Sequence, residues 1–126
     1  MSRAGAALVL LLLVGQGGCA APGDVATLTL PRPRDIGESV FLEVQVGRLG
    51  SGHEIELSTE SGRPLGVISP HGIGPGRDAG TYAVPLPAYA VRDGRVRVRL
   101  RVTRAGDAPR RPDDSEVRGL RVVMGR

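Results

Sequence analysis

The chain has 126 residues, a formal net charge of +4, no tryptophan and a single cysteine. One cysteine excludes an internal disulfide, and so small an excess of positive charge does not by itself indicate a nucleic-acid partner. The length suits one domain, and an apolar content that is mostly aliphatic favours strands over helices.

The first 18 residues have the organisation of an export signal. Arg3 precedes an apolar run at positions 6–14, and mostly small residues follow up to position 20. The run is much shorter than the roughly 20 apolar residues that a membrane-spanning helix needs. We therefore expect the protein to be exported, with residues 1–18 as its signal peptide.

The end of this segment resembles the type II signal peptide of bacterial lipoprotein precursors, because glycines at positions 17 and 18 precede Cys19. In that family the cysteine is lipidated and becomes the first residue of the mature chain, although an aliphatic residue is usual where this sequence has Gln16. The resemblance implies that Cys19 carries a lipid, that residues 19–24 include a short tether, and that Ala20 directs the protein to the outer membrane. Conventional cleavage, which would release a soluble periplasmic or secreted protein, is the alternative.

From residue 25 onward, apolar and polar residues alternate in short segments that are separated by turn signals. The alternation is clearest at 39–46, where Val40, Leu42 and Val44 fall on one face. Pro85 indicates that its strand lies at the edge of a sheet or ends there. The segments expected as strands are 25–30, 39–46, 54–59, 64–69, 81–86, 95–104 and 117–124.

This succession of short strands predicts an all-β fold, an antiparallel β-sandwich over residues 25–126, with a small closed β-barrel as the alternative. No internal repeat is visible. The strand rhythm, with a long proline-bearing loop before the closing strand, resembles that of jelly-roll carbohydrate-binding modules. That resemblance implies a fold and does not identify a ligand.

Arginine occupies alternate positions of the segment 95–104, and apolar residues occupy the positions between. Such a stripe can bind the phosphate, sulfate or carboxylate groups of a polyanion. It can equally be a solvated sheet face that pairs with Glu43, Glu54 and Glu56 on other strands, and the presence of these acids favours this second interpretation. The arginine stripe consists of Arg95, Arg97, Arg99 and Arg101.

The glycine-rich loop at 70–80 is a second candidate site. His71, Arg77 and Asp78 could together hold a polar ligand, since long loops on a rigid sandwich often carry binding groups. The alternative is a plain connection whose glycines adopt backbone angles that other residues rarely adopt, and this alternative is favoured.

No pattern in the chain indicates a metal site or catalysis. His53 and His71 are the only histidines and have no further ligand at a useful spacing. Asp113, Asp114 and Glu116 lack the spacing of a calcium loop and are interpreted as a solvated acidic loop. No Gly-x-Ser-x-Gly motif is present, so no cofactor, metal ion or catalytic residue is expected.

We therefore expect an exported, lipid-anchored protein of the bacterial cell envelope with a structural or accessory binding role, and not an enzyme. The alternative is a carbohydrate- or polyanion-binding module that uses the arginine stripe or the 70–80 loop. The expected partners are the membrane, through the lipid anchor, and a polysaccharide or another envelope protein, with no nucleic acid.

Overall fold

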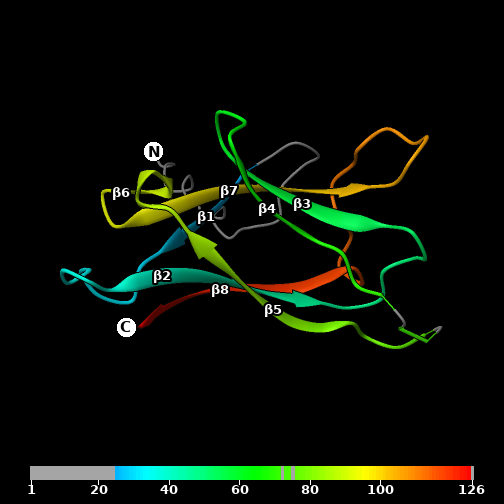
Figure 1. Cartoon of the computed structure of the whole chain (residues 1–126), viewed down its shortest axis with the longest axis horizontal. Helices are drawn as coiled ribbons and strands as arrows, with labels where there is room; N and C mark the ends of the chain where they lie inside the picture. Colours follow the sequence, from blue (N-terminus) through cyan, green and yellow to red (C-terminus); the bar gives the residue numbers. More distant parts are fainter. Residues whose placement is uncertain (1–24, 72, 75, 126) are drawn as a thin grey trace, which may run out of the picture.

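The computed structural model describes residues 25–71, 73–74 and 76–125. They form two antiparallel β-sheets that pack face to face, so the predicted all-β sandwich is confirmed and the closed barrel is not (Figure 1). Within these residues no helix is long and apolar enough to cross a membrane. The expected signal peptide, Cys19 and the tether lie outside the described residues.

The two sheets differ in size. The larger sheet has the order β1 (Ala26–Thr29), β7 (Arg95–Thr103), β3 (Glu54–Thr59) and β4 (Pro64–Ile68), and the short β6 (Val91–Arg92) pairs with the beginning of β7. The smaller sheet has the order β5 (Gly80–Leu86), β2 (Ser39–Val46) and β8 (Val117–Gly125).

The seven predicted strands are all present, and their ends differ from the prediction by only one residue. Pro85 lies on β5, which pairs only with β2 among the described strands and is therefore the expected edge strand. The turn of 3-10 helix at Ala88–Ala90 and strand β6 were not predicted, because each is too short to show a hydrophobic period.

The core lies between the sheets and consists of aliphatic side chains. Leu42 and Val44 of β2 face Ile55 and Leu57 of β3, and all four are fully buried. The alternation read from the sequence therefore assigned the inward faces correctly. The other buried residues of this cluster include Val40, Val46, Ile68, Val84, Val96, Val98, Val102 and Val122.

Two connections between the sheets have the same sequence pattern, Arg-x-x-Asp-x-x-Glu, at 32–38 and 110–116. The first connects β1 to β2 and the second connects β7 to β8. Strands β1 and β7 are neighbours in the larger sheet, and β2 and β8 are neighbours in the smaller sheet. The domain therefore contains an internal structural repeat, contrary to the expectation from the sequence.

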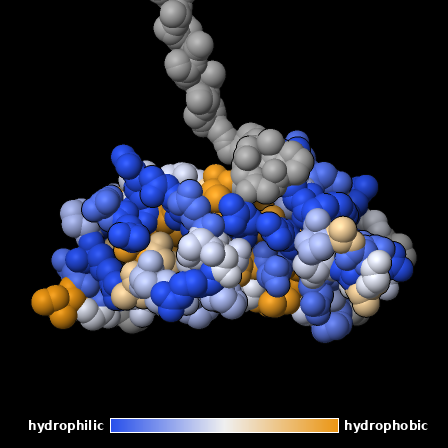
Figure 2. Space-filling model, turned by 90° about the horizontal axis from the view of Figure 1, so that it is seen from above, coloured by the Kyte–Doolittle hydropathy of each residue, from blue (hydrophilic) through white to orange (hydrophobic). Residues whose placement is uncertain are grey.

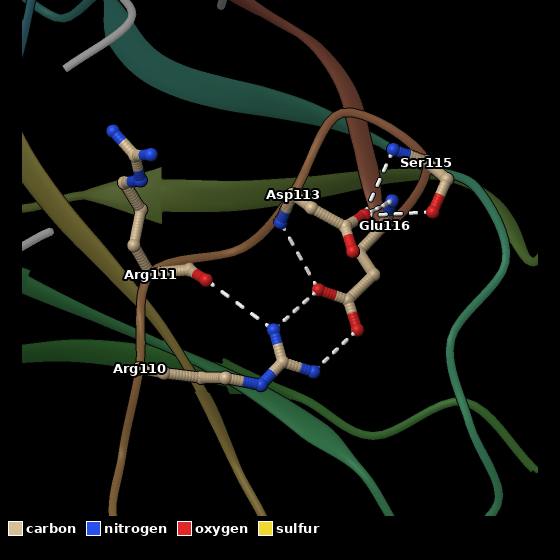
Figure 3. Close-up of polar contacts among 5 residues, drawn as sticks. All are labelled: Arg110, Arg111, Asp113, Ser115 and Glu116. Atoms are coloured by element: carbon tan, nitrogen blue, oxygen red, sulfur yellow. Dashed lines mark hydrogen bonds and ion pairs between the residues drawn. The ribbon is translucent and has the colours of Figure 1, made fainter. Parts of the chain in front are cut away.

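Each repeat ends in a buried glutamate that is held by the arginine six residues earlier (Figure 3). Arg110 donates two hydrogen bonds of 2.7 Å to the two carboxylate oxygens of Glu116. The backbone N–H of Asp113 donates a third, of 3.0 Å, to Glu116 Oε1. The Asp113 carboxylate accepts from the backbone N–H and the hydroxyl of Ser115. We call each such loop, with its ion pair, a clasp.

The first clasp repeats the contacts to the glutamate, but not those of the aspartate carboxylate, because Gly37 stands where the second clasp has Ser115. Arg32 donates from both terminal nitrogens to the carboxylate of Glu38, and the backbone N–H of Asp35 donates to Glu38 Oε1 at 2.8 Å. Glu38 is 3% exposed and Glu116 is 6% exposed. The interpretation of Asp113, Asp114 and Glu116 as a solvated acidic loop is therefore wrong for Glu116, which is buried and paired.

The contacts of the second clasp also change its protonation equilibria. The hydrogen bonds from Arg110 lower the pKa of Glu116, and the hydrogen bonds from Ser115 lower the pKa of Asp113. Both carboxylates are therefore ionised at neutral pH. The clasp is built to hold a charged glutamate inside the sandwich.

Candidate functional site

The arginine stripe lies on the outer face of the larger sheet. Arg95, Arg97 and Arg101 are exposed on β7, and the apolar residues that alternate with them point into the sandwich. Arg99 is half-buried, and its guanidinium donates to the carbonyl of Glu60 at 3.0 Å. Figure 2 looks onto this face and shows a mainly hydrophilic surface.

The acids expected to neutralise the stripe do not do so. Glu43 belongs to the smaller sheet, where it forms an ion pair of 2.7 Å with Arg121. Glu54 accepts a hydrogen bond from the hydroxyl of Ser69, and Glu56 lies opposite Arg101 in the strand register without an ion pair. In the part of the chain that the structure describes, Arg95, Arg97 and Arg101 form no ion pair or side-chain hydrogen bond. The expected pairing is therefore absent at three of the four positions.

Two arginines of this face lie directly opposite each other. Asp93 and Gly94, both with positive φ, form the two-residue turn between β6 and β7. The turn pairs Arg92 with Arg95 in the strand register. Like charges in this position repel each other, so the arrangement costs stability unless an anion lies between them.

An open cleft of about 550 Å³ lies beside this pair. Arg63, Arg92, Arg95 and Arg97 line it together with two acids, Glu60 and Asp93, so its formal charge is 4 − 2 = +2. We call it the basic cleft. Arg95 and Arg97 belong to the arginine stripe, whereas Arg63 and Arg92 do not.

Tyr89 gives the basic cleft an aromatic wall. The ring is 42% exposed, and the guanidinium of Arg63 lies over it, 3.6 Å from the ring centroid. The Tyr89 hydroxyl donates to the carbonyl of Pro64 at 3.5 Å, which connects this wall to the beginning of β4. The cleft therefore combines bidentate donors for phosphate, sulfate or carboxylate with an aromatic wall that holds one of these donors, Arg63, in position.

Only two of the three residues predicted for the 70–80 loop share a cleft. His71 and Arg77 line a second cleft, of about 570 Å³, with His53 and Arg48. Asp78 instead forms an ion pair with Arg118 at 3.0 Å. The described residues contain no group of three or more potential metal ligands, and His53 Nδ1 is buried there without a hydrogen-bond partner.

A larger hollow of about 710 Å³ lies at the open side of the sandwich, between β1 and β8. Leu28, Leu100 and Leu120 contribute apolar surface to it. Part of its charged rim is already occupied, because Asp113 belongs to the second clasp and Arg118 is paired with Asp78, while Arg111 and Asp114 add one charge of each sign. The basic cleft is smaller but has more unpaired charge to offer a ligand.

Comparison of the chain with protein-family models, with curated proteins and with solved structures found no match. The functional interpretation therefore depends on the site itself.

Part of the basic cleft could have been found in the sequence. The segment Val91–Val96 reads Val-Arg-Asp-Gly-Arg-Val, and Asp-Gly between two β-prone dipeptides is a strong signal for a tight hairpin. That hairpin places Arg92 beside Arg95. Tyr89 lies directly before this hairpin, whereas Arg63 comes from the turn between β3 and β4, and only the tertiary structure brings it to the same place.

Proposed function

We propose that this protein is an exported, lipid-anchored accessory protein of the bacterial cell envelope, and that its basic cleft binds the anionic groups of an envelope polyanion. Of the two roles expected from the sequence, the binding role is supported by one observation above all. Arg92 and Arg95 are register partners of like charge, and neither forms an ion pair within the described residues.

The other arginine contacts support a functional role for this pair. Arg118 and Arg121 of β8 each have an acidic partner, Asp78 and Glu43 respectively. The charges of Arg118 and Arg121 are thus neutralised, as expected for a solvent-exposed sheet face that binds no ligand. On the larger sheet Arg92, Arg95 and Arg97 form no ion pair among the described residues, and this contrast favours a ligand for the cleft over a purely structural role.

The cleft suits a flexible anionic chain better than a small enclosed ligand. It is open to solvent, and guanidinium groups can bind phosphate or carboxylate in pairs at successive positions along a polymer. The jelly-roll resemblance belongs to the same proposal, because the chain passes repeatedly from one sheet to the other, as in such modules. A polysaccharide with phosphate or uronate groups is the ligand class that these features favour.

The proposed anchor would keep the cleft close to its ligand. If Cys19 is lipidated, five residues lie between it and the beginning of the described chain at Val25, so the six steps from Cα to Cα span at most roughly 20 Å. Such a short tether confines the domain to the membrane surface, where anionic polysaccharide and lipopolysaccharide are concentrated. Local concentration would then compensate for the modest affinity of an exposed site.

The proposal can be tested with a charge-matched pair of double variants. Arg92→Gln with Arg95→Gln removes two charges from the cleft, and Arg118→Gln with Arg121→Gln removes two charges that are already paired. We expect the mature protein to bind lipopolysaccharide or a polyuronate, with an affinity that falls steeply as salt is added. The cleft variant should lose this binding and keep its stability, because it also loses a repulsion.

Two results would contradict the proposal. Absence of binding by the unaltered protein at low salt would leave the structural role as the better interpretation. Equal losses in the two double variants would show that the ligand senses only the net charge of the molecule and not the cleft.

A further inference from the structure

One large apolar side chain is almost completely exposed. Ile36 is 99% exposed, whereas Val67, the next most exposed large apolar residue described, is 57% exposed. Ile36 belongs to the first clasp loop, which projects at one end of the sandwich (Figure 1). Figure 2 shows an apolar projection at this same end of the molecule.

The loop that carries Ile36 is held in place on both sides. Arg32 binds the buried Glu38 carboxylate, and the backbone N–H of Glu38 donates to the carbonyl of Asp35 at 3.1 Å. Gly37, directly after Ile36, has a φ of +83°, which closes the turn. The isoleucine is therefore presented by an ordered turn, and little conformational entropy remains to be lost on binding.

The second clasp shows that the fold does not require an apolar residue at this point. Its pattern places Asp114 where the first clasp has Ile36, and the two loops form the same ion pair and the same backbone contact to the glutamate. The clasp conformation is thus compatible with a charged residue at the tip. The fold therefore does not account for the isoleucine, and contact with another molecule would.

The charges around the tip favour an anionic surface. The backbone N–H of Leu30, just before the loop, donates to the carbonyl of Gly94 at 2.9 Å, in the turn that separates Arg92 from Arg95. Arg34 and Asp35 lie within the loop itself and are exposed, so with Asp93 of the turn this end carries Arg34, Arg92 and Arg95 against two acids, a small positive excess. A flat anionic surface that approaches this end meets the isoleucine and these arginines together.

We propose that the 31–38 loop is a membrane-docking tip, with Ile36 entering the interface of an anionic bilayer while the neighbouring arginines contact its headgroups. One apolar side chain is too weak to hold a protein at a membrane alone, and a second signal is needed. The inference rests on the proposed lipid anchor for that second signal, and it shares Arg92 and Arg95 with the proposed basic cleft, whereas Ile36 belongs to the tip alone. Docking would fix the orientation of the domain on the surface.

The absence of tryptophan from the chain provides a local test. Ile36→Trp places a single indole at the tip, and Asp114→Trp places one at the equivalent position of the other clasp, at the opposite end of β2 and β8. Each mature, lipidated protein is reconstituted in phosphatidylglycerol vesicles and, separately, in phosphatidylcholine vesicles. Tryptophan emission and its quenching by acyl-chain-brominated lipid are then measured.

We expect the indole of Ile36→Trp to emit at shorter wavelength in the anionic vesicles than in buffer and to be quenched by the brominated lipid. The effect should be smaller in phosphatidylcholine and absent for Asp114→Trp in both. An Ile36→Trp indole that stays in water on vesicle-bound protein would overturn the inference, and would leave a protein partner as the occupant of the tip. A failure of the anchor itself would instead be seen as protein without a fatty-acid label, which keeps the two failures distinguishable.

Discussion

The clasps predict that the two members of a single ion pair contribute unequally to stability. Arg110→Ala leaves Glu116, which is 6% exposed, as a buried carboxylate without its counter-ion. Glu116→Gln leaves an arginine whose side chain is 48% exposed and can turn to water. The glutamine can still accept the hydrogen bond from the Asp113 backbone N–H. The arginine variant should therefore be the less stable of the two.

The magnitudes follow from these exposures. Removing one partner of a fully buried pair costs about 3–5 kcal/mol, and the partial exposure of Arg110 places its removal near the lower limit, at about 3 kcal/mol. Glu116→Gln exchanges charged hydrogen bonds for neutral ones and should cost about 1 kcal/mol. With a urea m-value of about 1–1.5 kcal/mol/M, the unfolding midpoint should fall by about 2–3 M for Arg110→Ala and by less than about 1 M for Glu116→Gln.

Far-UV circular dichroism is the appropriate assay, because the chain has no tryptophan to report on unfolding. Urea titrations at neutral pH give the two midpoints, and an unchanged m-value would show that the comparison is valid. In the first clasp, Arg32→Ala should likewise unfold at a lower urea concentration than Glu38→Gln. Equal losses for Arg110→Ala and Glu116→Gln, or a loss below about 0.5 kcal/mol for both, would refute the view that a buried carboxylate dominates the clasp.

Acid should destabilise the domain through the second clasp, because the pKa of Glu116 is lowered on folding. The stability that this shift contributes is complete at neutral pH and is lost as the pH falls below about 4.5 and through the folded-state pKa. In Glu116→Gln the free energy of unfolding should therefore depend less on pH in the acid range. Leu42→Ala should lower the free energy of unfolding in urea by about 2–5 kcal/mol, because Leu42 is fully buried. Gln45→Ala, at an exposed position of the same strand, should lower it by less than about 0.5 kcal/mol. Equal losses would mean that the assigned faces are wrong. A tagged fatty acid should label the unaltered protein in cells and leave Cys19→Ala unlabelled; an unlabelled parent protein would contradict lipidation.

The strands were predictable because their signal is local. In Ser39–Val46 and Arg95–Thr103 every second residue is apolar, and burial of one face requires that period. The same local rule placed the arginine stripe on an outer face. Strand β6 escaped prediction because two residues cannot show a period, although the Asp-Gly turn beside it was visible.

The partners of the charged residues were not predictable, because they depend on which sheet each strand joins. Glu43 has the outward direction that the sequence indicated, but it lies on the smaller sheet and meets Arg121. The expected loop group failed for a similar reason, since Asp78 pairs with Arg118, 40 residues away in the sequence. The clasp repeat was present in the sequence and went unrecognised, because only three of its seven positions recur.

Arginine has different roles in different parts of this domain, and its partners separate them. Arg32 and Arg110 neutralise buried glutamates at two of the connections between the sheets, so folding itself accounts for their presence. Folding gives no such account of Arg92 and Arg95, which repel each other across a hairpin with no carboxylate partner in the described chain. In natural proteins, a local arrangement that lowers stability occurs mainly at functional sites. In the basic cleft, the repulsion between Arg92 and Arg95 lowers the stability of the fold, which is the physical reason to look for the ligand there.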